Sequence, residues 1–548
     1  MPSPATSSSI SAVKQSGSVL IDALIHGLKW GGSLGSGVAL SYSFPWTNGD
    51  TVFLGYNGSS GYSTLDEANA VLHYGLNVQQ QQAASAALQA WANVANIQFS
   101  QVTDTASNVG DIRFGFTSAN NLSSIGTQAW GWAHYPSSSS PVGGDIWLST
   151  QGPAASNPSW SPGSENYQAI IHEVGHALGL KHSFEDGTVL PASLDSNTYT
   201  VMSYNDPVDS LFRTIVYKQN GAYSWQTFHV NAETPMVLDI AAMQYIYGAN
   251  KSFHTSDDVY TFDPHIPFVK AIWDAGGNDS ISVSNFTEGC VINLVPGSYS
   301  SIRILPDAAP ANYTGPTPTY DGSNNFGIAF GAIIENAVGG KGNDVLTGND
   351  VANRLTGGGG NDQLDGGNGT DTAVYAGIRS QFTVSKNGSG YSVTDSSGTE
   401  GADAVVNIER LQFADAAVAL DTNGVAGEAY RIYQAAFDRV PDLAGLGYWI
   451  RDMDKGSSLI DVASGFIASP EFQKLYGAAP SHTAMLDKLY QNVLHRTPDQ
   501  AGYAYWIKEL DSGQISAAGI LASFSESVEN QLQVIGKISN GIDYLVYT

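Results

Sequence analysis

Residues 172–182 read HEVGHALGLKH and hold side chains that bind metal ions and transfer protons. His172 and His176 are four residues apart, so on a helix they share one face, about one turn from each other. Two imidazole nitrogens in this arrangement can bind one metal ion. Glu173 is rotated off the line of the two histidines, so its carboxylate can face a metal-bound water. The pattern predicts a hydrolytic metal centre.

A third ligand is available because Gly179 tolerates a positive φ, which would end the helix and turn the chain. His182 can then return to the same ion. Three neutral nitrogens leave the fourth position open, as a catalytic zinc requires. Zinc lowers the pKa of its bound water and polarises a carbonyl, while Glu173 would pass the water's proton to the leaving amine. We therefore expect one catalytic Zn²⁺.

The alternative is a histidine-bearing helix packed in a core, because a bare HExxH arises by chance. Here the pattern extends by a glycine and a further histidine at fixed offsets. Histidine accounts for 11 and glycine for 60 of the 548 residues, so this extension is hard to obtain by coincidence. The longer pattern favours the metal site.

HExxHxxGxxH followed by TVMSYND (200–206) resembles the metzincin zinc endopeptidases, whose helix is followed by a methionine-containing turn. Met202 matches that methionine, which the resemblance places beneath the zinc as an apolar floor. The MSY sequence is similar to the serralysin group of bacterial exoproteases. There, the tyrosine two residues after the methionine is a movable fifth zinc ligand that helps stabilise the tetrahedral intermediate. Tyr204 occupies this position, and a packed loop tyrosine is the alternative.

The resemblance covers roughly residues 20–375. One departure is KHSFEDG (181–187), where family members often carry a proline after the third histidine; it affects the expected path of the loop and not the ligands. The resemblance also implies that GDIWL (144–148) is the edge strand above the cleft. An extended peptide would add to it by main-chain hydrogen bonds, which implies broad specificity.

Four tandem nine-residue units start at residues 339, 348, 357 and 366. Each can be divided into a six-residue turn and a three-residue strand. The glycines permit the turn and expose carbonyls, and the aspartates add charge, a combination that suits calcium. The second unit lacks the central glycine and has Asn353 in place of the aspartate. The eighth residues are apolar and are expected to face a thin core: Leu346, Leu355, Leu364 and Ala373.

This pattern is typical of the parallel β-roll of repeats-in-toxin proteins; a flexible Gly/Asp-rich linker is the alternative, which the strict period argues against. Asp257, Asp274 and Asp279 in earlier loops are further calcium candidates, unless they are ordinary turn aspartates. Without calcium, stacked aspartates repel, so folding should depend on calcium concentration. By resemblance, the oxygens for several structural Ca²⁺ ions come from Glu335, Gly340, Gly342, Asp344, Gly358, Gly360, Asp362, Gly367, Gly369 and Asp371.

The hydrophobic patterns predict a multidomain protein. Residues 1–17 are Ser-rich and are expected to be disordered, as a candidate short propeptide. Residues 18–250 mix helical patterns such as 79–96 with strand patterns, as an α/β metzincin-like catalytic domain would. Residues 251–420 are expected to form the all-β calcium domain, a parallel β-roll with sandwich-like strands. Residues 424–548 are expected to form an all-α C-terminal domain. The predicted strands of the catalytic domain include 38–44, 97–102 and 111–116.

The C-terminal segment contains a duplication, because residues 433–450 and 490–507 repeat one another at an offset of 57. It resembles a domain of unknown function on other bacterial repeat-containing exoproteins. Its repeated side chains could form a surface for an unknown partner, or they could be helix caps and core aromatics. The corresponding pairs are Tyr433/Tyr490, Arg439/Arg496, Asp442/Asp499, Gly445/Gly502 and Trp449/Trp506.

The composition limits location and partners. Lys and Arg total 23 against 50 Asp and Glu, and the net charge of −27 argues against binding to nucleic acid. No apolar run approaches the length of a membrane span, and the N-terminus lacks the pattern of a secretory signal. Cys290 is the single cysteine, so no disulfide forms within the chain. Calcium is scarce in cytosol and about millimolar outside cells, which indicates an extracellular protein.

We therefore expect a secreted, calcium-stabilised zinc endopeptidase that hydrolyses proteins and peptides outside a bacterial cell, where it could attach to a cell surface. The resemblance implies export by a type I-like secretion machinery that reads an uncleaved C-terminal signal, and GIDYLVYT (541–548) is compatible with one. The alternative is a calcium-dependent adhesive or surface-binding exoprotein with a vestigial metal site. The repeats argue against a cytosolic hydrolase of small molecules.

Overall fold

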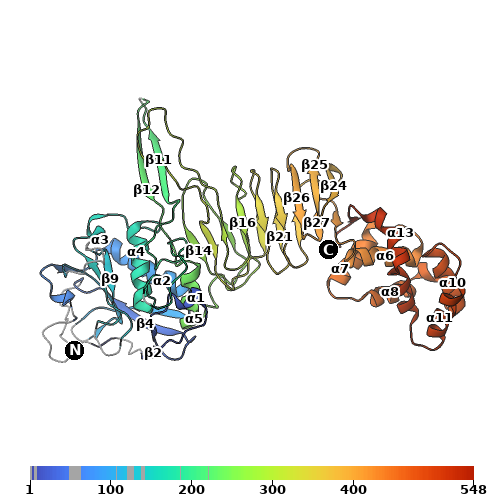
Figure 1. The fold of residues 1–548 in the computed structure, drawn as a ribbon, viewed down its shortest axis with the longest axis horizontal. Helices are drawn as coiled ribbons and strands as arrows, with labels where there is room; N and C mark the ends of the chain where they lie inside the picture. The colour runs from blue at the N-terminus through green and yellow to red at the C-terminus, as the bar shows by residue number, and fades with distance from the viewer. Residues whose placement is uncertain are drawn as a thin grey trace. The chain divides into compact units, whose positions relative to one another are not determined.

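The computed structural model describes residues 3–4, 9–47, 63, 65–105, 108–119, 129–137, 142–185, 187–219 and 221–547 (Figure 1). The chain divides into two compact units, Met1–Ile334 and Glu335–Thr548. Among the described residues, no helix combines the length and the apolar character that crossing a bilayer requires.

The N-terminal part of the first unit is built on a mixed sheet with strand order β6-β4-β8-β10-β9. β4 (Val38–Ser43), β6 (Ile97–Gln101), β8 (Ile112–Thr117) and β10 (Ile146–Ser149) run parallel, and β9 (Gly131–Ala133) is antiparallel to β10. Every residue of β8 is buried, as in a strand covered on both faces. β5 (His73–Tyr74) also pairs with β8. The predicted strands at 38–44, 97–102 and 111–116 are confirmed.

Three helices belong to the same part of the first unit as this sheet: α2 (Val78–Val94), α4 (Glu165–Leu178) and α5 (Val237–Tyr247). The helix predicted over 79–96 is α2, and Asn77 caps it by accepting a hydrogen bond from the N–H of Gln80. Trp91 of α2 is fully buried and donates from Nε1 to the carbonyl of Ile171 on α4. The helix with the histidines is thereby fixed against the longest helix of the unit.

Two expectations for the first unit are wrong. GDIWL does not contain the edge strand, because β10 lies between β8 and β9, and β9 occupies the edge. Residues 1–17 are not a disordered segment where the structure describes them, at 3–4 and 9–17. β2 (Ile10–Ala12) pairs with β3 (Leu28–Trp30), and β1 (Ser3–Pro4) pairs with β7 (Asn108–Val109). Low local hydrophobicity did not reveal pairing partners elsewhere in the chain.

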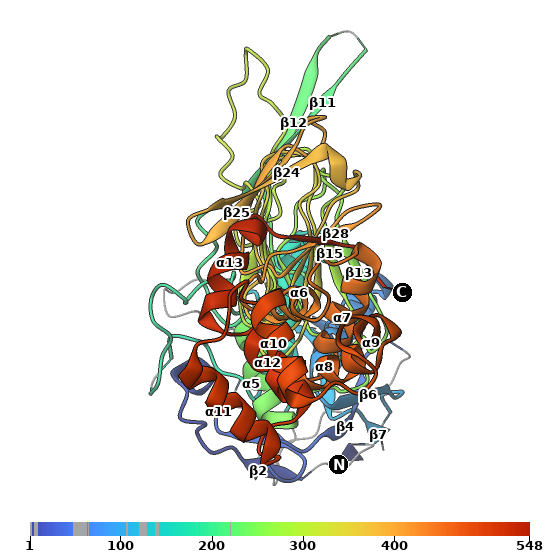
Figure 2. The same ribbon diagram turned by 90° about the vertical axis from the view of Figure 1, so that its right-hand side faces the viewer.

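The rest of the first unit consists of short elements: α1 (Val19–Asp22), α3 (Pro153–Ser156), β13 (Val259–Thr261), β14 (Lys270–Ile272), β15 (Ser280–Ser282), β16 (Val291–Asn293), β17 (Tyr299–Ser300) and β18 (Phe326–Ile328). One longer hairpin stands out from them. β11 (Leu211–Tyr217) and β12 (Tyr223–His229) form a two-stranded arm, which projects at the top of Figure 2.

The nine-residue units of the second unit form three-residue strands separated by six-residue turns. β19 (Asn336–Val338), β21 (Arg354–Thr356) and β23 (Thr372–Val374) are neighbours in one parallel ladder, and β20 (Val345–Thr347) and β22 (Gln363–Asp365) are neighbours in another. Because the chain alternates between ladders, each strand pairs with the one two units later. The apolar eighth residues are buried: Leu346, Leu355, Leu364 and Ala373.

Both ladders continue beyond the repeats. β23 pairs with β27 (Arg410–Gln412), which is followed by β28 (Ala417–Ala419); β22 pairs with β26 (Ala402–Val406). β24 (Phe382–Asn387) and β25 (Gly390–Asp395) extend the latter sheet antiparallel.

The C-terminal part is helical but not all-α, which corrects that expectation. Its last strand, β29 (Ile542–Tyr544), returns to pair with β28. Arg410 of β27 also binds Asp421 at 2.5 Å and Asp454 at 2.8 Å, so the helices are joined to the sheet through the buried guanidinium of Arg410. The helices are α6 (Val425–Phe437), α7 (Leu443–Asp454), α8 (Leu459–Ala468), α9 (Pro470–Tyr476), α10 (His482–Asn492), α11 (Gln500–Asp511), α12 (Ala517–Ser525) and α13 (Val528–Ile538).

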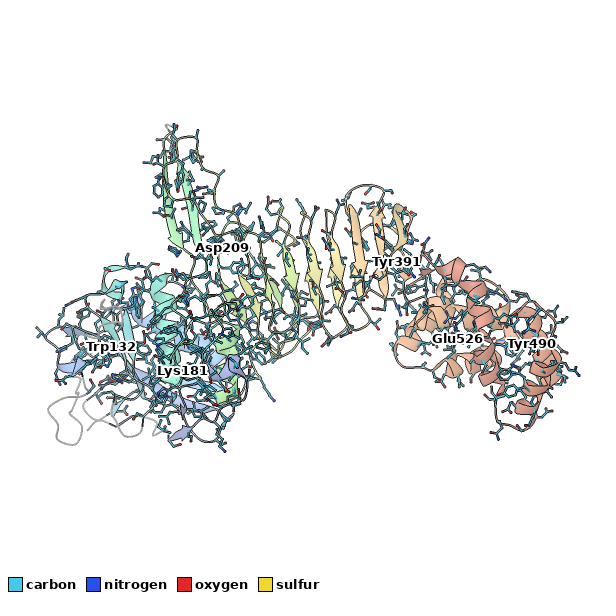
Figure 3. All side chains as sticks on the ribbon, viewed as in Figure 1. Trp132, Lys181, Asp209, Tyr391, Tyr490 and Glu526 are labelled. Atoms are coloured by element: carbon cyan, nitrogen blue, oxygen red, sulfur yellow. The ribbon has the colours of Figure 1, made fainter. Side chains whose placement is uncertain are left out.

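The duplicated side chains serve the fold of these helices. Asp442 and Asp499 are the N-caps of α7 and α11, accepting hydrogen bonds from the N–H of Gly445 and Gly502 at 2.8 and 2.7 Å. Tyr433 and its counterpart Tyr490 (Figure 3) are buried, and an arginine guanidinium lies 5.1 Å from each ring centroid. Trp449 and Trp506 pack against Phe466 and Phe524. Of the two alternatives, caps and core aromatics account for the pattern.

We predict that Leu364→Ala destabilises the second unit by about 2–5 kcal/mol, because it leaves a cavity in a thin core. Urea denaturation at saturating calcium would measure the free energy of unfolding. Gln363→Ala is the matched control, since Gln363 is exposed on the same strand, and should change that energy by less than about 0.5 kcal/mol. Equal effects of the two substitutions would contradict the packing role of Leu364.

Candidate active site

The helix α4 begins and ends where its sequence dictates. Ser164 is the N-cap and accepts a hydrogen bond from the N–H of Tyr167 at 3.3 Å. Gly179 ends the helix with φ 107°, in the left-handed region. A Cβ at this position would lie 2.3 Å from the carbonyl oxygen of Leu28, so only glycine fits. The turn at Gly179 sends the chain back toward His172 and His176.

The structure brings the three histidines together. The ring centroids of His172 and His176 are 4.6 Å apart, and His182 lies 5.1 Å and 4.4 Å from them. Each ring offers one nitrogen within 4.8 Å of those of the other two, and Nε2 of His176 and Nε2 of His182 are 3.0 Å apart. Three donors within this distance can share one small ion.

The opposite ring nitrogens are occupied, which selects the tautomer. Nδ1 of His172 donates to the carbonyl of Val201 at 2.6 Å, and Nδ1 of His176 donates to that of Leu180 at 2.8 Å. Nδ1 of His182 donates to the carboxylate of Glu185 at 2.5 Å. Each Nε2 therefore carries a lone pair, as a zinc ligand must.

Burial keeps these imidazoles neutral. Desolvation, followed by repulsion from His182, lowers the pKa of His172 to about 3. Desolvation also lowers the pKa of His176 well below its usual value, and it lowers that of His182. The neutral form is the one that binds a metal, so the donor set fits zinc.

Met202 is fully buried and packs against α4 at Gly175, which lies between His172 and His176 in the sequence. A Cβ at Gly175 would be 2.8 Å from its sulfur, so the small residue on α4 lets the methionine approach. Asp239 of α5 holds the turn, accepting hydrogen bonds from the N–H of Val201 at 2.7 Å and the hydroxyl of Thr200 at 2.5 Å. Burial raises the pKa of Asp239 to about 7. No local pattern pointed to Asp239, because its partners lie nearly forty positions earlier.

Glu173 and Tyr204 flank the histidine cluster. Oε2 of the buried Glu173 has no hydrogen-bond partner among the described residues, and burial raises the pKa of this carboxyl to about 8. The hydroxyl of Tyr204 lies 2.8 Å from Nε2 of His182, although the side chain is 65% exposed. Desolvation of the hydroxyl, with the nearby charge of Glu173, raises its pKa to about 12. Tyr204 therefore remains protonated at neutral pH and can donate a hydrogen bond.

A cleft of about 1,070 Å³ opens onto these residues. Its wall includes Trp130 and Gly131 at the edge strand β9, and Phe228 and His229 at the end of β12. Glu67 supports β9, because its buried carboxylate accepts hydrogen bonds from Nε1 of Trp132 at 3.1 Å (Figure 3) and from His134 at 2.9 Å. Sequence reasoning missed Glu67 because these partners are more than sixty residues away.

The loop after His182 is also held in place. Lys181 (Figure 3) donates to the carbonyls of Glu185 and Thr188 at 3.2 and 2.9 Å. The Lys181 hydrogen bond holds the backbone of Glu185, whose carboxylate accepts the hydrogen bond from Nδ1 of His182. The position of Glu185, three residues after His182, is a signal that the sequence offered and that its interpretation did not use.

The repeat region and the strands after it stack carboxylates in two columns. Each of these residues directly precedes a strand, except Asp403, which lies within β26. In the first column the N–H of Asp344 donates to Asp362 at 2.8 Å, and the N–H of Asp362 donates to Asp403 at 2.9 Å. In the second, the N–H of Asp371 donates to Glu409 at 2.8 Å. Asp403 and Glu409 were missed, because β24 and β25 interrupt the nine-residue period before them.

These columns contain acceptors without donors. Oδ2 of Asp362 and Oδ2 of Asp371 are buried and have no hydrogen-bond partner among the described residues. Burial raises the pKa of Asp362 to about 6 and that of Asp371 to about 7. A hard cation would satisfy such oxygens, so the donor set fits calcium.

The turns stack closely enough to share ligands. A Cβ at Gly358 would be 2.3 Å from the carbonyl oxygen of Gly340, and a Cβ at Gly360 would be 2.3 Å from that of Gly342. The remaining candidates lie in the turns of the other ladder. Gly367 and Gly369 belong to the turn before Asp371, and the Glu335 carbonyl accepts a hydrogen bond from Nδ2 of Asn353 at 3.0 Å.

Asn353 makes one turn different from the others. Its amide also donates to Oδ1 of Asn349 at 3.1 Å, so hydrogen bonds close this turn where a carboxylate would need a cation. The replacement of aspartate by asparagine in the second unit thus has a structural consequence.

Of the three aspartates predicted as calcium ligands in the earlier loops, Asp274 belongs to a possible metal-binding group, and Asp257 and Asp279 do not. Asp274 lies with His254 and Asp258, and one ligand atom from each is within 4.8 Å of the other two. His254 and Asp258 were not among the sequence candidates. Asp257 is not part of this group and instead accepts a hydrogen bond from the N–H of Asn278 at 3.0 Å. Asp279 accepts one from the N–H of Asp258 at 2.7 Å.

Comparison with known proteins agrees with this geometry. A family model described as matrixin matches residues 68–209, and one described as peptidase M10 serralysin C terminal matches 237–309 and 321–467. Together the two matches support a serralysin-type metzincin metalloprotease over residues 68–209, 237–309 and 321–467. A model of a domain of unknown function matches residues 463–534, which lie within the duplicated helices.

Curated relatives include serralysin of Proteus mirabilis, 33% identical over 357 residues, which cover 60% of this chain and 63% of the relative. Serralysin of Photorhabdus luminescens is 33% identical over 301 residues, 51% of this chain and 54% of the relative. Metallopeptidase AprA of Pseudomonas marginalis is 31% identical over 338 residues, 58% and 61%. The chain therefore spans somewhat more than half the length of these relatives.

We predict that Gly179→Ala lowers zinc affinity about 10–100-fold, because the added Cβ would displace the turn that carries His182. Competition with a chromophoric chelator would measure the affinity. Gly513→Ala is the control: this glycine also has positive φ, 73°, but a Cβ there meets open space, so the variant should lose some stability and keep its zinc affinity. Zinc binding by Gly179→Ala at wild-type strength would contradict the role given to the turn.

Proposed function

We propose that this protein is a secreted zinc-dependent endopeptidase that hydrolyses protein substrates. One observation carries the proposal: three neutral imidazoles converge next to a buried carboxylate oxygen of Glu173 that lacks a partner, at the wall of a cleft. The matches to the two family models support it, as do relatives named serralysin and metallopeptidase. A vestigial site would not need this complete set of groups.

Zinc would be held by His172, His176 and His182, and it would supply Lewis acidity and a water of lowered pKa. Glu173 accepts the proton of that water at Oε2 and delivers it to the nitrogen of the leaving amine. Its raised pKa suits both steps, because a carboxyl that titrates near neutrality can take up and release a proton. Tyr204, with its hydroxyl beside His182, donates a hydrogen bond to the oxygen on which charge develops.

The substrate would bind as an extended chain along β9. This strand is the edge of its sheet and contributes to the cleft, so its backbone can hydrogen bond to a peptide. Backbone pairing depends little on side chains, which favours broad specificity. The rest of the cleft wall includes the carboxylates of Glu165, Glu173, Asp206 and Glu233. Neither lysine nor arginine is among the described residues of this wall.

We further propose that the two carboxylate columns bind structural calcium within a parallel β-roll formed by the stacked turns. Unpaired oxygens on Asp362 and Asp371 support this proposal. Calcium would relieve the repulsion within each column, so this region should fold where calcium is abundant. An extracellular location and a type I-like secretion route accord with this requirement.

We predict that Glu173→Gln reduces kcat/KM for casein about 10²–10⁴-fold while one zinc remains bound, since the amide cannot accept the proton. Casein hydrolysis and metal analysis of the same preparation would show both effects. Glu288→Gln, which alters an exposed carboxylate elsewhere in the first unit, is the control and should retain full activity. Persistent hydrolysis by zinc-loaded Glu173→Gln would refute the assigned role. Absence of hydrolysis by the wild-type protein would favour the adhesive alternative.

We predict that Asp362→Asn raises the calcium concentration needed for half-maximal folding about tenfold, because it removes a charge from the first column. Circular dichroism during a calcium titration would measure this midpoint. Asp350→Asn is the matched control, since Asp350 is exposed in the turn that Asn353 already closes, and its midpoint should stay at the wild-type value. Coincident curves for all three proteins would exclude Asp362 as a ligand.

A further inference from the structure

Two segments lie outside the matched family models and pack against each other. The matrixin match ends at residue 209 and the serralysin C-terminal match starts at 237, so the β11–β12 arm (211–229) falls between them. The second match also omits residues 310–320. Arg213 on β11 joins the two segments. Its guanidinium lies 4.6 Å from the ring centroid of Tyr313, which is in the omitted segment. Its Nη2 also donates to the carbonyl of Asp307, just before that segment, at 2.5 Å.

The loop of residues 303–320 covers the outer edge of β11. The N–H of Leu211 donates to the hydroxyl of Thr319 at 3.2 Å, and the N–H of Ile215 donates to the carboxylate of Asp307 at 2.6 Å. The carbonyl of Leu211 accepts the N–H of Thr319 at 2.9 Å. The N–H groups of Leu211 and Ile215 and the carbonyl of Leu211, which face away from β12, therefore have partners in this loop.

The outer edge of β12 is open. Leu211, Arg213 and Ile215 lie opposite His229, Thr227 and Trp225, respectively. In an antiparallel pair, opposite residues both face inward or both face outward, in alternation. Since the N–H groups of Leu211 and Ile215 face outward, so do the backbone groups of Trp225 and Thr227. No described residue forms a hydrogen bond with these outward groups.

This edge lacks the usual protection. The sequence of β12, YSWQTFH, contains no proline, lysine or carboxylate to keep another strand away. Trp225 is 39% exposed and Phe228 is 41% exposed, so apolar side chains flank the free backbone. An exposed, uncharged edge of this kind is a template for strand addition.

The open edge is continuous with the catalytic cleft. Phe228 and His229, the last two residues of β12, belong to the wall that also includes Glu173 and Tyr204. A polypeptide that leaves the cleft at this point meets the edge of β12 next. Seven residues of strand offer roughly 23 Å of backbone.

We propose that the outer edge of β12 is an exosite that pairs with an extended segment of a polypeptide substrate beyond the residues held in the cleft. The inference rests on the proposed endopeptidase function, since the occupant is its substrate. Pairing through the backbone selects unfolded chains long enough to reach the edge, without selecting a sequence. The arm therefore favours long, unstructured proteins over short peptides.

The test uses Thr227→Pro in the full-length, zinc-loaded, calcium-saturated protein. Proline removes the outward N–H, and it leaves the hydrogen bonds to β11 intact because Thr227 does not donate to that strand. We expect kcat/KM for reduced, carboxymethylated casein to fall about 3–10-fold, and kcat/KM for a six-residue peptide that fills only the cleft to stay unchanged. Thr227→Val, which keeps the N–H, is the matched control and should retain the wild-type ratio of the two values.

Unchanged casein hydrolysis by Thr227→Pro overturns the exosite, and so does an equal loss on both substrates, which would report damage to the cleft. A dimer in sedimentation experiments that Thr227→Pro dissociates would also overturn it, because a second copy would then occupy the edge. If the wild-type protein cleaves neither substrate, the proposed function fails, and that result is separate from any difference between the variants.

A second measurement is independent of the folding of the proline variant. Hydrogen exchange of Glu173→Gln with saturating carboxymethylated casein should show slower exchange of the amides in 223–229. The six-residue peptide should leave their exchange rates unchanged. Equal exchange in the presence and absence of casein would overturn the exosite even if the proline variant did not fold.

Discussion

The geometry of the histidine cluster depends on three hydrogen bonds made by the ring nitrogens that face away from the proposed zinc. Val201, Leu180 and Glu185 receive them, and these acceptors belong to the methionine turn, the end of α4 and the following loop. If one acceptor moved, its ring could rotate and the common point of the Nε2 lone pairs would be lost. The hydrogen bonds and the burial act together: the first select the tautomer and the second suppresses the protonated form.

The two kinds of metal site differ in what exists before the metal binds. Around the histidines every outer nitrogen already has its partner, so the site is organised in advance. In the carboxylate columns, oxygens of Asp362 and Asp371 are buried without donors, and their raised pKa values report the cost of ionising them. Calcium would complete the fold of this region, while zinc would enter a scaffold that packing has already fixed. The turn that contains Asn353 is an exception, because the side-chain amide of Asn353 supplies the hydrogen-bond donors that this turn needs.

Sequence reasoning succeeded where the signal is local. The positions of α2 and α4, the turn at Gly179 and the alternating three-residue strands all follow from spacing within a few residues. It failed where the deciding contact is distant. The edge position of β9 depends on the order in which strands associate, and Asp239, Glu67, Asp403 and Glu409 find their partners far along the chain. The Ser-rich N-terminus looked disordered because nothing near Ile10–Ala12 shows that β3 will pair with it.

The arm formed by β11 and β12 shows how a structure can be stabilised on one side and left reactive on the other. A two-stranded hairpin alone is only marginally stable in water. The loop of residues 303–320 adds hydrogen bonds and side-chain contacts that stabilise it. Arg213, sandwiched between Asp307 and Tyr313, joins the two segments by charge and by ring contact. This loop also packs on one face of the hairpin, where Tyr313 contacts the ring of Trp225 and the carbonyl of Asn312 accepts a hydrogen bond from the hydroxyl of Tyr223. Among the described residues it forms no hydrogen bond with the outer backbone edge of β12, so the arm gains its rigidity without closing that edge. The free backbone is therefore presented at a fixed place beside the cleft, and a substrate strand that pairs there need not order the protein in order to bind.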